Sequence, residues 1–138
     1  MREQIRDQIL AQGNRAAEQA RIARETAGAP RELVETCVHN YVCFKFLLDP
    51  SEGQGLTMSE LAEKSIERAL DMKIPLAKES EITTTCGAAG SAAMKIALLL
   101  TALKKDFQVT IEPRRLGFVK DTAELGDLVY RAMQGENV

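Results

Sequence analysis

Apolar side chains recur every three or four residues along most of the chain, and this spacing restricts it to a helical fold. The clearest case is the segment 88–106 with the residue that follows it, in which the recurring apolar residues are Met94, Ala97, Leu100, Leu103 and Phe107. The stretch 108–111 alternates as a strand would, but it has no second strand to pair with. The sequence therefore predicts an all-α fold, a four-helix bundle.

Capping and turn residues divide the chain into separate helices. An Ala-Pro break separates a polar helix over 2–27 from a more apolar helix that follows it. Thr57 and Glu60 have the spacing of a capping box, which predicts the start of a third helix. Asp121 or Thr122 is expected to cap the last helix. A long connection precedes the dominant helix, and the stretch after it is expected to be an extended loop with at most one helical turn.

The helices fall into an expected order of regions. We expect an N-terminal helical extension over 1–55, a helical bundle over 56–134 and a short loose tail over 135–138. The helix over 2–27 carries only a thin apolar stripe, which favours a surface position. The alternative for this helix is that it binds a partner or a second copy of the chain.

Charge and composition exclude several functions. The chain of 138 residues has 18 Lys+Arg and 20 Asp+Glu, a net charge of −2, which argues against binding nucleic acid through phosphates. Aromatic residues make up 4%, so a base-stacking platform is not expected. The apolar runs are too short to span a membrane, and the polar start does not resemble a secretion signal. Three cysteines without a Cys-x-x-Cys pair predict reduced thiols in a cytoplasmic protein. The oligomeric state is left open.

No residue pattern indicates an enzyme or a metal site. His39 is the sole histidine, and it shares a helix with Cys37 and Cys43. His39 and Cys43 lie on one face, but two ligands do not make a structural zinc site. We therefore expect both cysteines in the core, and His39 as a hydrogen-bonded residue at its rim. Arg114-Arg115 is expected to be a solvated pair.

Residues 57–133 resemble the acyl carrier protein family. The resemblance rests on the order of the helices, on the Phe-x-Val-x-Ile-x-Pro ending over 107–113 and on the Thr-x-x-Leu opening over 122–125. It implies an acyl-carrier type of bundle that tethers an acyl or aminoacyl thioester and presents it to biosynthetic partner enzymes. Those partners would dock on the second carrier helix, the segment 88–106.

The family carries 4'-phosphopantetheine on a Ser in an Asp-Ser-Leu signature at the start of that helix, where free backbone N–H groups favour the phosphodiester. This chain has Ala92-Ala93-Met94 at the matching place, and Ala93 has no hydroxyl. Ser91 lies two residues before Ala93, and it is the candidate for carrying the arm. Its other interpretation is a Ser in the first turn or cap of the helix.

Two alternatives stay open. The family's second helix is usually acidic, whereas this one carries Lys95, Lys104 and Lys105, which favours a degenerate carrier that acts as an interaction subunit without a prosthetic group. The other alternative is a carrier that uses the thiol of Cys86. A helix N-terminus would lower the pKa of that thiol, although a buried structural cysteine would look the same in the sequence.

Overall fold

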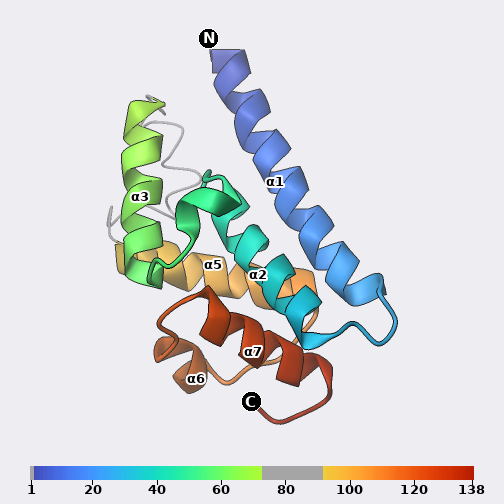
Figure 1. Ribbon diagram of the computed structural model, residues 1–138. Helices are drawn as coiled ribbons and strands as arrows, with labels where there is room; N and C mark the ends of the chain where they lie inside the picture. The colour runs from blue at the N-terminus through green and yellow to red at the C-terminus, as the bar shows by residue number, and fades with distance from the viewer. Residues whose placement is uncertain (1, 73–91) are drawn as a thin grey trace.

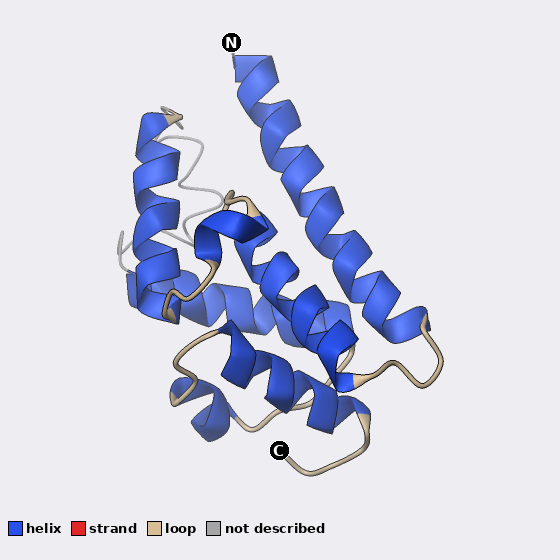
Figure 2. Cartoon of the chain, in the orientation of Figure 1, coloured by secondary structure: helices blue, strands red, loops and turns tan. Residues whose placement is uncertain are grey.

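The computed structural model describes residues 2–72 and 92–138, and their regular structure is helical (Figure 1, Figure 2). The helices are α1 (Arg2–Glu25), α2 (Arg31–Lys45), α3 (Met58–Asp71), α5 (Ala92–Phe107), α6 (Pro113–Gly117) and α7 (Thr122–Met133), with a 3-10 helix, η1, at Pro50–Gly53. Among the described residues no strand is present, which confirms the predicted all-α class.

Helix α2 lies at the centre of the molecule. Figure 1 shows it between α1 and α7, and it packs against both helices. Six of its side chains are buried, namely Val34, Cys37, Val38, Tyr41, Val42 and Cys43. Such a wide apolar face lets one helix contact neighbours on two sides. Helix α3 packs instead against α5, so the helix that lies along α7 is α2 and not α3.

One hydrophobic core joins the two halves of the chain. Ala16, Ala20 and Ala23 of α1 are buried in the same cluster as Leu103 and Phe107 of α5. Small alanines allow the backbone of α1 to approach its neighbours closely. The boundary expected at residue 55, between the N-terminal extension and the bundle, stays a prediction. Helices before and after it contribute side chains to the same core.

The predicted helix starts are confirmed at two caps. The Thr57 hydroxyl accepts a hydrogen bond from the Glu60 N–H at 3.2 Å, and the Glu60 carboxylate accepts one from the Thr57 N–H at 2.9 Å. The Asp121 carboxylate accepts a hydrogen bond from the Glu124 N–H at 2.9 Å. These side chains satisfy N–H groups that the first turn of a helix leaves unpaired. Helix α6 is the single short helical turn expected between α5 and α7.

One expectation is wrong in detail, and the buried face of α5 differs from what simple periodicity would indicate. Val138 is buried, and its backbone oxygen accepts a hydrogen bond from the Glu112 N–H at 2.7 Å, so the end of the chain is not a loose tail. Met94 and Ala97 are exposed, while Leu99 of the same helix is buried. Helix α5 is apolar on nearly every side, so its periodicity alone does not fix the buried face.

Candidate functional site

The predicted attachment residues, Ser91 and Cys86, lie outside the described residues. The described part of α5 begins at Ala92, and the exposed Ala93 follows it. The next residues, Met94 and Lys95, also have no hydroxyl. The described first turn of α5 therefore does not fit a phosphopantetheine arm, because the attachment needs a hydroxyl.

An apolar groove of about 680 Å³ lies beside this turn. Helix α5, helix α6 and the loop after α6 supply most of its lining: Ala93, Ile96, Ala97, Leu100, Leu116 and Phe118. The start of α3 closes it with Met58 and its neighbours. Of the described residues that line the groove, Lys120 alone is charged. The groove can therefore take an apolar group with an anionic group next to it.

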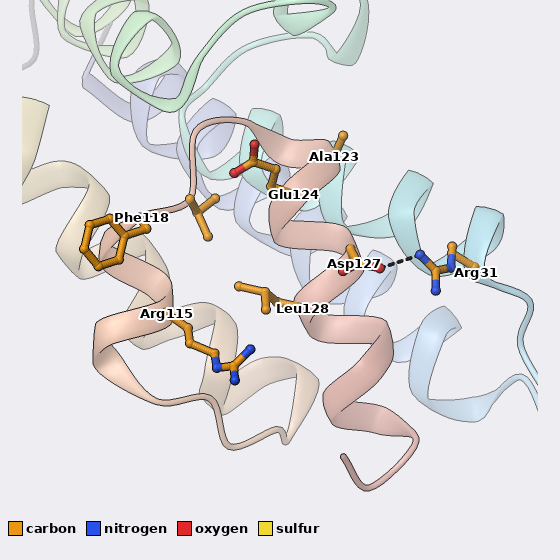
Figure 3. A pocket seen from close by; sticks show the side chains of 8 residues that line it. Arg31, Arg115, Phe118, Ala123, Glu124, Asp127 and Leu128 are labelled. Atoms are coloured by element: carbon orange, nitrogen blue, oxygen red, sulfur yellow. Dashed lines mark hydrogen bonds and ion pairs between the residues drawn. The ribbon is translucent and has the colours of Figure 1, made fainter. Parts of the chain in front are cut away.

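A second hollow, of about 580 Å³, lies on the other side of Phe118, between α6 and α7 (Figure 3). Its lining includes Arg115, Phe118, Val119, Glu124, Asp127 and Leu128. Phe118 is 82% exposed, the largest exposed fraction among the large apolar residues of the described chain. The two hollows and this ring form one surface, which we call the Phe118 surface.

The charged side chains around the second hollow differ in whether they form ion pairs within the chain. Arg31 forms an ion pair with Asp127, and its guanidinium lies 5.2 Å from the centre of the Tyr130 ring. Arg115 forms no ion pair with any carboxylate of the described chain. Glu124 accepts one hydrogen bond from the Lys120 N–H at 3.1 Å. The charges of Arg115 and Glu124 are therefore available for ion pairs with another molecule. Arg114 and Arg115 are both exposed, as predicted.

The cysteines and the histidine of α2 are structural, as the sequence predicts. Cys37 and Cys43 are buried. The Thr122 hydroxyl lies 2.7 Å from His39 Nδ1, and the Pro50 carbonyl lies 2.9 Å from Nε2. A carbonyl only accepts, so Nε2–H donates to Pro50, and Nδ1 forms a hydrogen bond with the Thr122 hydroxyl. His39 therefore ties α2 to η1 and to the start of α7.

Cys43 is not an activated nucleophile, although its Sγ lies 3.6 Å from His39 Nε2. Burial, with the negative charges of Asp49 and Glu52, raises the pKa of Cys43 to about 12. Burial also raises the pKa of Cys37. Both groups are thus thiols near neutral pH, and a thiol is a far weaker nucleophile than a thiolate.

Lys95 does not contribute to an exposed basic face of α5. Its ammonium donates a hydrogen bond to the buried Ser65 hydroxyl at 3.1 Å and lies 5.9 Å from the centre of the Phe46 ring. Lys105, in the last turn, is exposed. The basic character expected of the whole helix is therefore concentrated at its end.

Sequence reasoning missed the Phe118 surface. The signal was a bulky apolar pair, Phe118-Val119, next to Gly117 and Lys120 in a connection with little periodicity. An apolar aromatic residue in a polar loop is a reason to look for a contact surface. Only the packing of α6 beside α5 and α7 shows that hollows lie on both sides of it.

The described residues contain no group of three His, Cys, Asp or Glu side chains that could hold a metal ion. Within the same residues, every helix is too short or too polar to cross a membrane. Comparison with protein-family models, with curated proteins and with solved structures finds no match for this chain.

Proposed function

We propose that the chain is a non-catalytic interaction module of carrier-like architecture, which binds a partner protein in the groove beside α5 without a prosthetic group. The observation that carries this proposal is the open apolar groove of about 680 Å³ along the first turns of α5. That helix is the one to which the family resemblance assigns partner docking. Its described first turn lacks the hydroxyl that an arm would need.

The chemistry of the groove defines the partner. Ile96, Leu100 and Leu116 offer apolar contact, and burial of one large apolar side chain there would contribute about 1.5–3 kcal/mol. Lys120 gives the lining a positive charge. The expected ligand is a partner segment with a large apolar side chain and a nearby carboxylate.

Site-specific photocrosslinking tests the proposal. A photoreactive amino acid at Ala97, which lines the groove, should crosslink one partner in cells of the source organism. The same amino acid at Glu67, exposed on α3, should not crosslink it. Once the partner is identified, Ala97→Glu should weaken its binding to the purified chain, since the carboxylate fills the groove and repels an acidic segment.

Thr101→Glu is the matched control for the binding measurement. Thr101 is exposed on α5 one turn after Ala97, and it does not line the groove. Equal binding of the Thr101→Glu chain and the unchanged chain is expected. If Ala97→Glu also leaves the affinity unchanged, or if Ala97 crosslinks nothing that Glu67 does not, the groove is not the docking site.

A phosphopantetheine carrier is the second candidate function. It is favoured by the position of Ala93, which lines the groove two residues after Ser91, so that the apolar part of a tethered cargo would have a place to pack. Intact mass measured after incubation with a phosphopantetheinyl transferase and coenzyme A distinguishes the two functions. A gain of one phosphopantetheine that Ser91→Ala abolishes and Ser59→Ala retains would establish the carrier and exclude the module without a prosthetic group.

A further inference from the structure

We propose that the chain forms a two-fold dimer through the hollow between α6 and α7. In this dimer the Phe118 rings of the two copies meet, and Arg115 of each copy lies opposite Glu124 of the other. The inference goes beyond the proposed function. Arg115 and Glu124 line this hollow and not the groove beside α5, whereas Phe118 and Val119 line both.

The apolar part of the argument comes from Phe118. Its ring is 82% exposed at the wall of a hollow of about 580 Å³ that also exposes Val119 and Leu128. An exposed ring at the edge of an apolar hollow can pack against its own counterpart across a two-fold axis, so that the two rings and the apolar walls beside them are removed from water together. Buried aromatic residues of this kind contribute much of the binding energy at protein interfaces.

The charged residues at the two ends of the hollow favour a second copy of the chain as its binding partner. Figure 3 shows Arg115 and Glu124 at opposite ends of the hollow, with Leu128 between them. No ion pair joins the two side chains within one copy, while Arg31 and Asp127 neutralise each other. A two-fold axis that lies in the interface, crosses the apolar middle and runs perpendicular to the line from Arg115 to Glu124 brings each end of the hollow onto the opposite end of the other copy. It therefore pairs unlike charges twice in each dimer.

Sedimentation equilibrium on the full chain, with charge-reversal variants, tests this arrangement. The unchanged chain should dimerise reversibly. Arg115→Glu and Glu124→Arg should each raise the Kd about a hundredfold or more, since each creates two like-charge contacts. The double variant should restore much of the affinity, because the pairs are then formed in reverse. Phe118→Ser should also dissociate the dimer.

Arg114→Glu is the control. Arg114 is exposed on α6 beside Arg115, but it does not line the hollow, so its reversal should leave the Kd nearly unchanged. Circular dichroism must show that each variant is folded, since Glu124 also accepts a hydrogen bond at the start of α7. Recovery in the double variant cannot come from a folding defect.

Several results would overturn the dimer. A chain that stays monomeric up to its solubility limit excludes it. A dimer that is insensitive to both single reversals uses another surface. Loss of dimerisation in the single variants without recovery in the double variant would exclude the pairing of Arg115 with Glu124. A monomer in which Arg115→Glu abolishes binding of a different protein would assign the hollow to that protein, because Arg115 lines the hollow and not the groove beside α5.

Discussion

Gly126 of α7 lies directly against the backbone of Glu35 in α2. A Cβ built on Gly126 would stand 2.9 Å from the Glu35 Cα and 3.0 Å from its Cγ. The nearest atom belongs to the backbone of a helix, so it cannot move away as a flexible side chain would. The closeness of the two helices at the centre of the molecule therefore depends on the absence of a side chain at position 126.

Gly126→Ala should destabilise the protein even though alanine has the higher helix propensity. Forcing α2 and α7 apart should cost about 1–3 kcal/mol of the free energy of unfolding, as overpacking of a core does. Gly13→Ala is the control, because a Cβ at Gly13 of α1 meets no atom within 4 Å. It should stabilise the helix by about 0.5–1 kcal/mol. Urea denaturation measures both changes, and a neutral Gly126→Ala would contradict the close contact.

The capping box of α3 gives a second prediction. Thr57→Ala removes the hydroxyl that accepts from the Glu60 N–H, and it should cost about 1 kcal/mol of the free energy of unfolding. Ser59→Ala changes an exposed hydroxyl two residues later, and its effect should stay within about 0.5 kcal/mol. Thermal unfolding followed by circular dichroism compares the two variants. Equal melting temperatures would show that the cap contributes nothing.

Stability should fall at alkaline pH because of Cys43. The pKa of its thiol is raised from an ordinary value of 9.0 to about 12 in the folded state. A raised pKa means that the folded state favours the neutral thiol, so the contribution to stability is complete below pH 9. It is lost as the pH rises from there toward the folded pKa of about 12.

The variant Cys43→Ala isolates this effect. It lowers the overall stability through lost packing, but it should also flatten the decline of the free energy of unfolding above pH 9. Urea denaturation at a series of pH values gives the slope of the free energy of unfolding against pH for the variant and for the unchanged chain. Parallel curves for the variant and the unchanged chain would mean that the Cys43 thiol titrates alike in the folded and unfolded states.

Alkylation tests whether Cys86 is a reactive thiol. Cys37 and Cys43 are buried and have raised pKa values, so iodoacetamide should modify both slowly near neutral pH. Rapid modification of the native chain should therefore map to Cys86, and Cys86→Ser should abolish it. Denatured protein, in which all three cysteines react, provides the reference rate. If the two buried thiols react at that rate in the native chain, their assignment to the core is wrong.

The predictable parts of this structure depend on neighbours close in sequence. The cap formed by Thr57 and Glu60 and the start of α7 at Asp121 involve residues three positions apart. Such contacts form within a single helical turn whatever the rest of the chain does.

The parts that could not be predicted depend on contacts between distant segments. Lys95 lies on the expected docking helix, but the position of α3 brings the Ser65 hydroxyl to its ammonium. The sequence predicts a loose end at Val138, but the Glu112 N–H donates a hydrogen bond to its backbone oxygen. Nothing near these residues in the sequence encodes such partners, because each partner lies more than twenty positions away.

The sequence by itself determined the helical class, the capped starts of α3 and α7 and the structural role of the α2 cysteines, since periodicity and capping act over one or two turns. Tertiary structure alone decided which side of the largely apolar α5 is covered and that hollows flank Phe118. The reason is that the exposed face of a helix is the face that no other element covers. Which elements pack against a helix depends on the packing of the whole chain.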